Sequence, residues 1–350
     1  PDGGLYMWEA IPKLDSATLQ SFTKLSFPEI AIQVLLPVLK DSVPIPTLEQ
    51  ICYDAFNFPV ILHSLADNVS ILELFHGPTY AFKDFGARFM ARLMRYFLEE
   101  STRAVTVLVA TSGDTGSAVA HGFYGVPGTE VVLLYPKGKV SELQEKQFTT
   151  LGGNVTALEV DGTFDDCQRL VKAAFVDSEI NAKRQLASAN SINIARLLPQ
   201  TLYYFYAASR CAEPPVFAVP SGNFGNLTAG LIAKAMGMNV QRFVAATNAN
   251  DVVPQYLLSG AFSPRPSLQT LSNAMDVGNP SNFARMMALY GGSLANIKSD
   301  LVGTVTTDDE TIERVKEIYS RYNYVCDPHT AVGYDGLMKY SAEAELKGGI

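Results

Sequence analysis

The 350-residue sequence has few of the residues that build metal, redox or disulfide sites. It contains only four histidines and four cysteines, and the cysteines are widely separated: Cys52, Cys167, Cys211 and Cys326. None of them forms a CxxC pair, and the histidines lack HExxH spacing, so neither pattern indicates a metal or redox motif. We therefore expect no metal ion, and reduced thiols such as cytoplasmic proteins usually keep.

Long apolar runs, nucleotide-binding glycine motifs and positive net charge are also missing. No apolar run approaches the roughly 20 residues that span a bilayer, and the N-terminus has no signal-peptide pattern. Neither GxGxxG nor GxxxxGK occurs, which argues against a nucleotide-binding module. The net charge of −8 and a pI near 5.1 argue against nucleic acid or an anionic membrane as a partner. We expect a cytoplasmic protein with a small-molecule ligand. If that ligand is an anion, the protein must bind it through a local positive site.

Strands alternate with helices over most of the chain, which indicates an α/β fold with mainly parallel sheets. The pattern recurs on both sides of about position 190, so we expect two mainly parallel open sheets flanked by helices, preceded by an N-terminal helical segment. The expected strands are 105–110, 131–135, 155–160, 216–219 and 243–247; the expected helices lie within 14–57 and at 84–99, 117–123, 140–151, 164–176, 197–210, 227–236 and 308–322.

One lysine has an unusual setting. Lys83 lies between Phe82 and Phe85, and we expect it at the end of a strand formed by the preceding apolar run. Burial of an unpaired ammonium is costly, so such a site favours the neutral amine. A neutral lysine amine is a nucleophile that can form an imine with an aldehyde cofactor. The alternative is that Lys83 extends its charged end into water, as most lysines do.

Two further segments are turns rich in glycine and hydroxyl or amide side chains, Thr111–Gly116 and Ser221–Asn226. Each follows a predicted strand and precedes a predicted helix. Glycine lets the backbone approach a ligand closely, and the first N–H groups of a helix attract an anion. Either turn alone could be a tight packing junction. Together with Lys83, they predict a reactive amine and two anion-binding turns.

Five segments, in order along most of the chain, resemble the threonine synthase family, in particular its bacterial and fungal branch. They are residues 75–84, 111–116, 190–196, 221–226 and 327–333. That family belongs to the pyridoxal-phosphate enzymes of fold type II, the tryptophan-synthase β-like group. The 221–226 turn resembles a loop shared across fold type II, whereas the lysine segment and the aspartate-containing turn are more specific.

The resemblance implies a domain division. We expect an N-terminal helical segment (1–60), a large cofactor-binding domain (61–83 and 190–350) and a smaller inserted domain (84–189). Both ends of the sequence look trimmed by comparison with the family. A hydroxyl residue that hydrogen-bonds the pyridine nitrogen in the family is therefore expected beyond position 350.

The resemblance also implies the residues that bind pyridoxal 5′-phosphate. Lys83 would be the catalytic residue and form the covalent link, and the cofactor phosphate would be held by Gly222, Asn223, Phe224, Gly225 and Asn226. Asp114 stands where many relatives have asparagine, next to the 3′-oxygen of the cofactor. It would either be protonated or take the proton from that oxygen, and the sequence leaves both open.

Substrate contacts are implied in the same way. The α-carboxylate would be bound by Thr111, Ser112, Gly113 and Thr115, although Thr115 could equally cap the helix that follows. A substrate phosphate would be bound by Ser191, Asn193 and Arg196, because guanidinium groups fit phosphate well. The alternative for Arg196 is a structural ion pair with a nearby anion. His329 is expected near the mouth of the site or in a structural role.

The predicted function is conversion of O-phospho-L-homoserine and water to L-threonine and phosphate, with the cofactor as electron sink. The alternatives are another fold-type-II enzyme, such as a phospho-lyase, a dehydratase or a cysteine-synthase-like enzyme, or a non-catalytic amino-acid-binding relative. We expect a monomer, with a dimer as the alternative.

Overall fold

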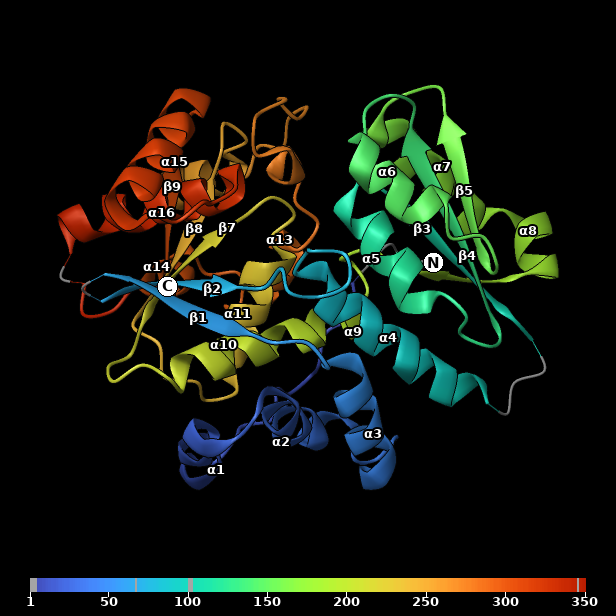
Figure 1. Cartoon of the computed structure of the whole chain (residues 1–350), viewed down its shortest axis with the longest axis horizontal. Coiled ribbons are helices and arrows are strands. Elements are labelled where there is room, and N and C mark those ends of the chain that lie inside the picture. Colours follow the sequence, from blue (N-terminus) through green and yellow to red (C-terminus); the bar gives the residue numbers. More distant parts are fainter. Residues whose placement is uncertain (1–4, 67, 100–102, 345) are drawn as a thin grey trace. The chain divides into compact units, whose positions relative to one another are not determined.

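The computed structural model describes residues 5–66, 68–99, 103–344 and 346–350. The chain divides into two compact units, and each is described by itself (Figure 1). Unit 1 comprises residues 1–26, 61–73 and 200–350, and unit 2 comprises residues 27–60 and 74–199. This grouping places residues 27–60 with the predicted smaller domain and residues 1–26 with the predicted larger one.

The N-terminal helices confirm the helical prediction for residues 14–57. Helix α1 (Ser16–Ser21) begins where Asp15 accepts a hydrogen bond from the N–H of Thr18 at 2.8 Å, and a short 3-10 turn, η1 (Phe22–Lys24), follows it. In unit 2, α2 (Phe27–Leu39) and α3 (Ile45–Ala55) pack beside α4 (Lys83–Leu98). Their contact is a cluster of aromatic rings from Phe27, Phe56, Phe58, Phe85 and Phe89.

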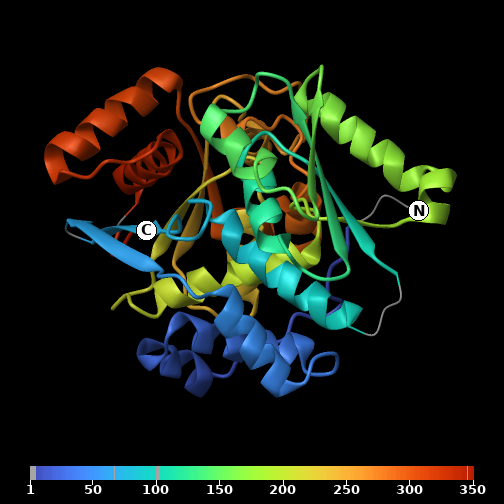
Figure 2. The same ribbon diagram turned by 45° about the vertical axis from the view of Figure 1, so that its right-hand side comes forward.

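Unit 2 contains a four-stranded parallel sheet in the order β5 (Val155–Val160), β4 (Thr129–Pro136), β3 (Val105–Ala110), β6 (Gln185–Ser188). All six residues of β3 are buried, as expected for a central strand of a sheet covered on both faces. Figure 2 shows α5 (Asp114–Phe123) and α6 (Glu142–Thr149) on one face and α7 (Phe164–Val176) on the other. The unit also contains α8 (Ser178–Lys183), α9 (Ile194–Leu197) and most of the turn η2 (Leu198–Gln200).

Unit 1 contains a parallel three-stranded sheet, β7 (Val216–Pro220), β8 (Arg242–Thr247) and β9 (Leu301–Val305), and an antiparallel pair, β1 (Ile61–Ala66) and β2 (Val69–Glu73). Side chains of α16 (Pro328–Glu343) pack on one face of β7 and β8, while α10 (Thr201–Ala208) and α11 (Gly225–Ala235) cover the other. The remaining elements are α12 (Val252–Ser259), η3 (Asn273–Met275), α13 (Phe283–Leu289), α14 (Leu294–Asp300) and α15 (Asp308–Tyr322).

The last residues of the chain connect the two parts of this sheet. Gly349 bridges to Val69 of β2 and to Val216 of β7, in parallel with both. Its N–H donates to the carbonyl of Asn68 at 2.7 Å and its carbonyl accepts from the N–H of Ser70 at 2.9 Å. Residues 348–350 therefore lie between β2 and β7 as a short central segment of the sheet.

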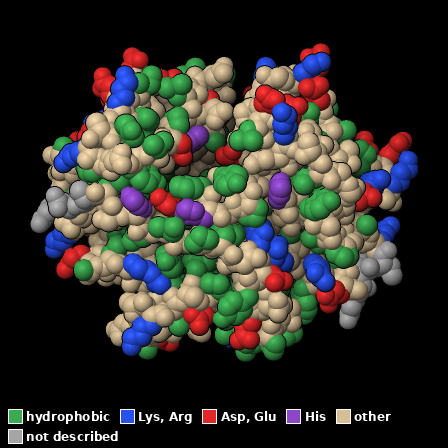
Figure 3. All heavy atoms as spheres, in the orientation of Figure 1, with side chains coloured by type: hydrophobic (Ala, Val, Ile, Leu, Met, Phe, Trp, Pro, Cys, Tyr) green, Lys and Arg blue, Asp and Glu red, His purple; other side chains and the backbone are tan. Residues whose placement is uncertain are grey.

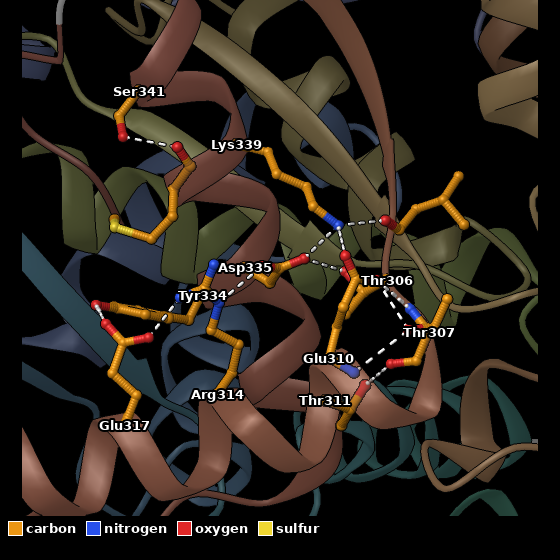
Figure 4. A network of polar contacts seen from close by, with 12 residues as sticks. Thr306, Thr307, Glu310, Thr311, Arg314, Glu317, Tyr334, Asp335, Lys339 and Ser341 are labelled. Atoms are coloured by element: carbon orange, nitrogen blue, oxygen red, sulfur yellow. Dashed lines mark hydrogen bonds and ion pairs between the residues drawn. The ribbon is translucent and has the colours of Figure 1, made fainter.

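A network of polar side chains holds α15 against α16 (Figure 4). Asp335, 1% exposed, accepts hydrogen bonds from Thr306 at 2.8 Å, Arg314 at 2.8 Å and Lys339 at 2.7 Å. Lys339 also contacts Glu310 at 2.9 Å, on the first turn of α15. A buried carboxylate is tolerated only when paired in this way, so the network fixes the relative position of the two helices.

The surface of the chain carries both signs of charge. On the face drawn in Figure 3, acidic and basic side chains are intermixed. Across the described ranges, no helix combines the length and the apolar character that crossing a membrane requires.

The mainly parallel α/β fold is confirmed, and three local predictions are corrected. Lys83 is the first residue of α4 and not the end of a strand, because Pro78 and the turn around Tyr80 follow β2. The helix predicted at 117–123 begins at Asp114. The helix predicted at 197–210 is divided by η2, where Pro199 lacks the N–H that a continuous helix needs.

Candidate active site

Lys83 lies at the N-terminus of α4, with its side chain 19% exposed. Its Nζ is 3.4 Å from Oδ2 of Asp114 and 5.6 Å from the centre of the Phe82 ring. A cation at a helix N-terminus opposes the helix dipole, so it needs a compensating anion. Asp114, on the first turn of α5, supplies that anion, and the structure thus brings these two predicted residues together.

The turn before α5 is held by Thr111, which is fully buried. The Thr111 hydroxyl accepts hydrogen bonds from the N–H groups of Gly113 at 3.0 Å and Gly116 at 2.8 Å, and donates to the Gly113 carbonyl at 3.1 Å. A hydroxyl has one donor and two acceptor positions, so the turn itself uses all of them. Thr115 lies inside the helix and does not cap it.

Two other hydroxyl groups of this turn have no such partner. Within the described ranges, no hydrogen bond involves the hydroxyl of Ser112, which is exposed, or that of Thr115, which is partly exposed. Since Thr111 is engaged in holding the turn, Ser112 and Thr115 are the side chains of this group best placed to bind a ligand. The role of all four predicted residues in binding a carboxylate stays a prediction.

A glutamine that the sequence did not reveal also contacts Asp114. Gln144, on the first turn of α6, donates a short hydrogen bond from its amide Nε2 to Oδ1 of Asp114. Both oxygens of the Asp114 carboxylate are therefore engaged, one by Gln144 and one by Lys83. Nothing in the local sequence around Gln144 marks it, because its importance depends on how α6 packs against α5.

Asp84, next to Lys83 in sequence, is completely buried and contacts the turn that precedes α4. Its carboxylate accepts hydrogen bonds from the N–H of Thr79 at 2.9 Å and from the Thr79 hydroxyl at 2.7 Å. Burial raises the pKa of Asp84, although the hydrogen bonds from Thr79 oppose that shift. This contact anchors the turn that leads into Lys83.

Arg196 is also buried, and its guanidinium donates a hydrogen bond to the carbonyl of Ala189. Burial lowers the pKa of Arg196 to about 10, against the opposing charge of Asp84. The nearby carboxylate and the carbonyl partner are what a structural role requires, which was the alternative considered for this residue. Its role in binding a substrate phosphate stays a prediction.

The segment around Arg196 ties together the ends of two strands. Asn190 donates to the carbonyl of Ala110 at 3.0 Å, and Asn193 donates to that of Ser188 at 2.8 Å. The Asn193 side chain also accepts from the N–H of Ala195 and so caps α9. The amide of Asn193 is thus used in the fold, and Ser191 lies partly exposed between the two asparagines.

The second glycine turn, 221–226, lies in unit 1 between β7 and α11. Gly222 passes so close to η3 that an added Cβ would lie 2.7 Å from Cα of Met275. Phe224 adopts the left-handed conformation, with φ of 60°, and is the N-cap of α11. As at every helix start, the first N–H groups have no carbonyl partner within the helix, and they are available to a phosphate group.

The two asparagines of this turn are fixed by hydrogen bonds. Oδ1 of Asn223 accepts from the N–H of Ser281 at 2.6 Å. Oδ1 of Asn226 accepts from the hydroxyls of Tyr203 at 2.7 Å and Tyr204 at 2.8 Å. Burial raises the pKa of both tyrosines well above the usual value, so they remain donors.

His329 supports the same turn indirectly. Its Nε2 accepts a hydrogen bond from the N–H of Ala274 at 3.2 Å, and its Nδ1 is 3.3 Å from Asp327. Ala274 belongs to η3, against which Gly222 packs. The structure thus gives His329 a structural contact, one of the two roles considered for it.

These residues fit pyridoxal phosphate in two respects. Unit 2 offers a lysine amine that is mostly shielded from water beside a carboxylate, and unit 1 offers a helix start preceded by a glycine that has no room for a side chain.

A separate cavity of about 330 Å³ lies at the amino ends of β3 and β6, away from the Thr111 turn. It is lined by residues that include Arg103, Lys183 and Arg184. In the portion that is described, no three histidine, cysteine, aspartate or glutamate side chains are grouped as metal ligands.

Comparison with known families agrees with these features. Residues 62–350 match the family described as "Pyridoxal-phosphate dependent enzyme", and residues 1–56 match "Threonine synthase N terminus". Together the two matches cover both units.

Individual relatives carry the same name. The chain is 46% identical to threonine synthase of Escherichia coli, over 95% of this chain and 78% of that protein, and 47% identical to the Haemophilus influenzae enzyme, over 96% and 79%. A crystal structure of threonine synthase from Brucella melitensis with bound cofactor superimposes with a TM-score of 0.92, at 35% identity, covering 99% of this chain and 81% of that one. A tomato threonine deaminase at 13% identity, TM-score 0.65, shares the fold.

Proposed function

The chain belongs to the threonine synthase family of pyridoxal-phosphate-dependent lyases, and from this premise we propose how its own residues form L-threonine and phosphate from O-phospho-L-homoserine and water. The observation that carries the proposal is the pairing of Lys83 with Asp114 at a helix start, in a site mostly shielded from water. Bound pyridoxal phosphate supplies an electron sink for negative charge on Cα and then on Cβ of the substrate.

Lys83 is proposed as the residue that attaches the cofactor and then moves protons. Once its amine is free, Nζ takes a proton from Cα and then one from Cβ, and the electron pair of the Cβ–H bond expels phosphate from Cγ. A proton is then delivered to Cγ, and the addition of water at Cβ is followed by return of a proton to Cα. A general acid or base in such a position contributes roughly 10²–10⁴-fold to the rate. Asp114 directs Nζ, because the carboxylate and the amine lie 3.4 Å apart.

The turn at the start of α5 is proposed to bind the substrate carboxylate. The hydroxyls of Ser112 and Thr115, with N–H groups of the turn, provide donors beside the helix N-terminus. Thr111 and Gly113 contribute by shaping the turn, since their polar groups are hydrogen-bonded to one another. Ser191, Asn193 and Arg196 are proposed to line the region that receives the substrate phosphate.

The turn in unit 1 is proposed to hold the cofactor phosphate. Gly222 and Gly225 allow close approach of the backbone, and the N–H groups at the start of α11 point along the helix dipole toward the bound anion. Asn226 adds an amide whose oxygen is fixed by Tyr203 and Tyr204, which leaves its NH₂ group as donor. Asn223 and Phe224 complete the turn.

The test combines product analysis with chemical trapping. The purified protein, loaded with pyridoxal phosphate, is incubated with O-phospho-L-homoserine; equimolar threonine and phosphate are expected. Release of 2-oxobutyrate and ammonia with the phosphate would instead indicate a phospho-lyase. Borohydride reduction and peptide mass mapping should place a pyridoxyl group on Lys83, and Lys83→Ala should lose both the label and at least about 10²-fold of the activity.

We also propose that the protein works as a monomer in the cytoplasm, without nucleic acid or membrane partners. The net charge of −8 supports the absence of those two kinds of partner, because like charge disfavours contact with polyanions. Light scattering after size-exclusion chromatography measures the mass in solution. A mass near 38.0 kDa is expected, and twice that value would indicate a dimer.

A further inference from the structure

Gln144 lies outside the predicted site and contacts one of its residues directly. Its amide Nε2 hydrogen-bonds Oδ1 of Asp114, while Lys83 contacts the other oxygen, Oδ2, at 3.4 Å. Gln144, Asp114 and Lys83 thus form a continuous chain through α6, α5 and α4. All three lie in unit 2.

The orientation of the Gln144 amide follows from its second partner. Its Oε1 accepts a hydrogen bond from the hydroxyl of Ser141 at 3.0 Å, and the same Ser141 oxygen caps α6 by accepting from the Gln144 N–H at 3.4 Å. With Oε1 engaged in this way, the NH₂ group faces Asp114. An amide N–H only donates, so this arrangement favours the ionised carboxylate.

The backbone provides room for this contact. Gly113 has φ of +142°, and a Cβ added there would lie 2.3 Å from Oε1 of Gln144. Glycine at position 113 therefore allows the positive φ of the turn and also leaves room for the side chain of Gln144. The hydroxyl of Ser117 contacts the Gln144 carbonyl at 3.3 Å, which further joins α5 to α6.

We propose that Gln144 is a positioning residue that keeps Asp114 ionised and directed at Lys83. The inference rests on the proposed function, because it assigns a role only in relation to that lysine. Gln144 does not touch the lysine itself; it acts through the carboxylate. Removing its amide would weaken the contact between Asp114 and Lys83 and leave the Lys83 amine more reactive.

The charged groups around Lys83 limit the alternatives. Asp114 is the carboxylate that faces its Nζ from α5. Asp84 on α4 is committed to Thr79, Arg196 of α9 is buried beside Asp84, and His121 of α5 contacts the carbonyl of Gln147. From α6, the uncharged side chain of Gln144 contacts Asp114. A change at Gln144 should therefore reach Lys83 through Asp114.

The experiment measures the reactivity of Lys83 in the cofactor-free chain at fixed pH. Trace acetic anhydride labels lysines as neutral amines, and mass spectrometry gives the labelling of Lys83 relative to the exposed Lys137. Gln144→Met should raise the ratio roughly threefold to tenfold, the effect of one lost hydrogen bond. Gln144→Glu should not raise it, because a second carboxylate keeps negative charge beside the lysine.

An increase in Gln144→Met without an increase in Gln144→Glu separates positioning of Asp114 from simple loosening of the helix. Equal increases in both variants, or no change in either, would overturn the proposal. Gln147→Met, on the same helix, is the matched control and should leave the ratio unchanged. Should Gln144→Met fail to fold, judged by thermal unfolding, Ser141→Ala provides the same comparison, with a smaller increase expected because it frees only the amide oxygen.

A second readout uses the cofactor-loaded protein. The ratio of the long-wavelength to the short-wavelength absorption band of the bound cofactor should change in Gln144→Met and stay unchanged in Gln147→Met. If the unaltered chain forms threonine but these variants match it in both readouts, only the role of Gln144 fails. If the unaltered chain forms no threonine, the proposed function itself fails.

Discussion

At the residue scale, the close approach of Gly222 to Met275 shows how strictly the backbone of the 221–226 turn is constrained. The nearest atom to an added Cβ belongs to the backbone of η3 and cannot rotate away. His329 holds the same 3-10 turn through the N–H of Ala274. The position of the 221–226 turn thus depends on η3, which it contacts, and on His329, which holds η3 in place.

We predict that Gly222→Ala displaces η3 and weakens cofactor binding about tenfold, which corresponds to about 1.4 kcal/mol. Overpacking of a tight contact costs about 1–3 kcal/mol, of which part should appear as reduced stability. Cofactor titration followed by fluorescence measures the affinity. Gly348→Ala is the control, since nothing lies within 4 Å of its added Cβ; equal affinity of the two variants would contradict the prediction.

The sequence led to hypotheses about the residues of the site but said less about their contacts. Lys83 and the two glycine turns were proposed because they occur together in one chain, and Asp114 because its segment resembles the family; their roles stay predictions. Gln144, Tyr203 and Tyr204 were missed, since their contacts join residues 20 or more positions apart. The hydrogen bonds of the Thr111 hydroxyl within its own turn were likewise not predictable from the sequence and are seen only in the structure.

At the element scale, helix ends were predicted where a capping residue marks them. Thr307 and Glu310 form the expected capping box of α15, and Asp15 caps α1. Strands β6 and β9 were missed because they are short and partly exposed. Neither has the continuous apolar run that made β3 recognisable.

The contact between α15 and α16 depends on one buried carboxylate. Burial alone would raise the pKa of Asp335, but hydrogen bonds from Lys339, Arg314 and Thr306 outweigh it and hold the pKa below its usual value. A lowered pKa means that the ionised form is bound more tightly in the folded state. Its contribution to stability is present above the unfolded-state pKa of about 3.9 and is lost as pH falls through the folded-state pKa.

Asp335→Asn should therefore lower the free energy of unfolding by about 3–5 kcal/mol at pH 7, the usual cost of breaking a buried pair. The difference from the unaltered chain should shrink as the pH falls below about 4. Urea unfolding at a series of pH values measures both. Glu313→Gln, exposed on α15, should show neither effect, and a difference for Asp335→Asn that is independent of pH would refute the argument.

At the scale of the whole molecule, both sheets were predicted to be mainly parallel because strands and helices alternate. The division into units was harder to predict, since it depends on which helices pack together. Residues 27–60 group with α4 through aromatic contacts such as that of Phe27 with Phe85. No periodicity within residues 27–60 indicates which later helix they will contact.

The segment 348–350 gives a test at this scale. Deleting it removes backbone hydrogen bonds to Asn68, Ser70, Val216 and Ala218 and should cost about 2–5 kcal/mol of stability. Hydrogen exchange should show faster exchange at the amides of Ser70 and Val216. Lys347→Ala, which keeps these bonds, is the control; unchanged exchange after the deletion would show that the segment is dispensable.

The place of Gly349 between Val69 and Val216 also bears on how the protein is made. Translation proceeds from the N-terminus, so β2 emerges from the ribosome long before the segment that joins it to β7. Pairings between such distant positions form slowly, and until then the facing edges of these strands are open to wrong partners. Unit 2, assembled entirely from residues 27–199, can form first, so we expect chaperone demand during synthesis to concentrate on unit 1.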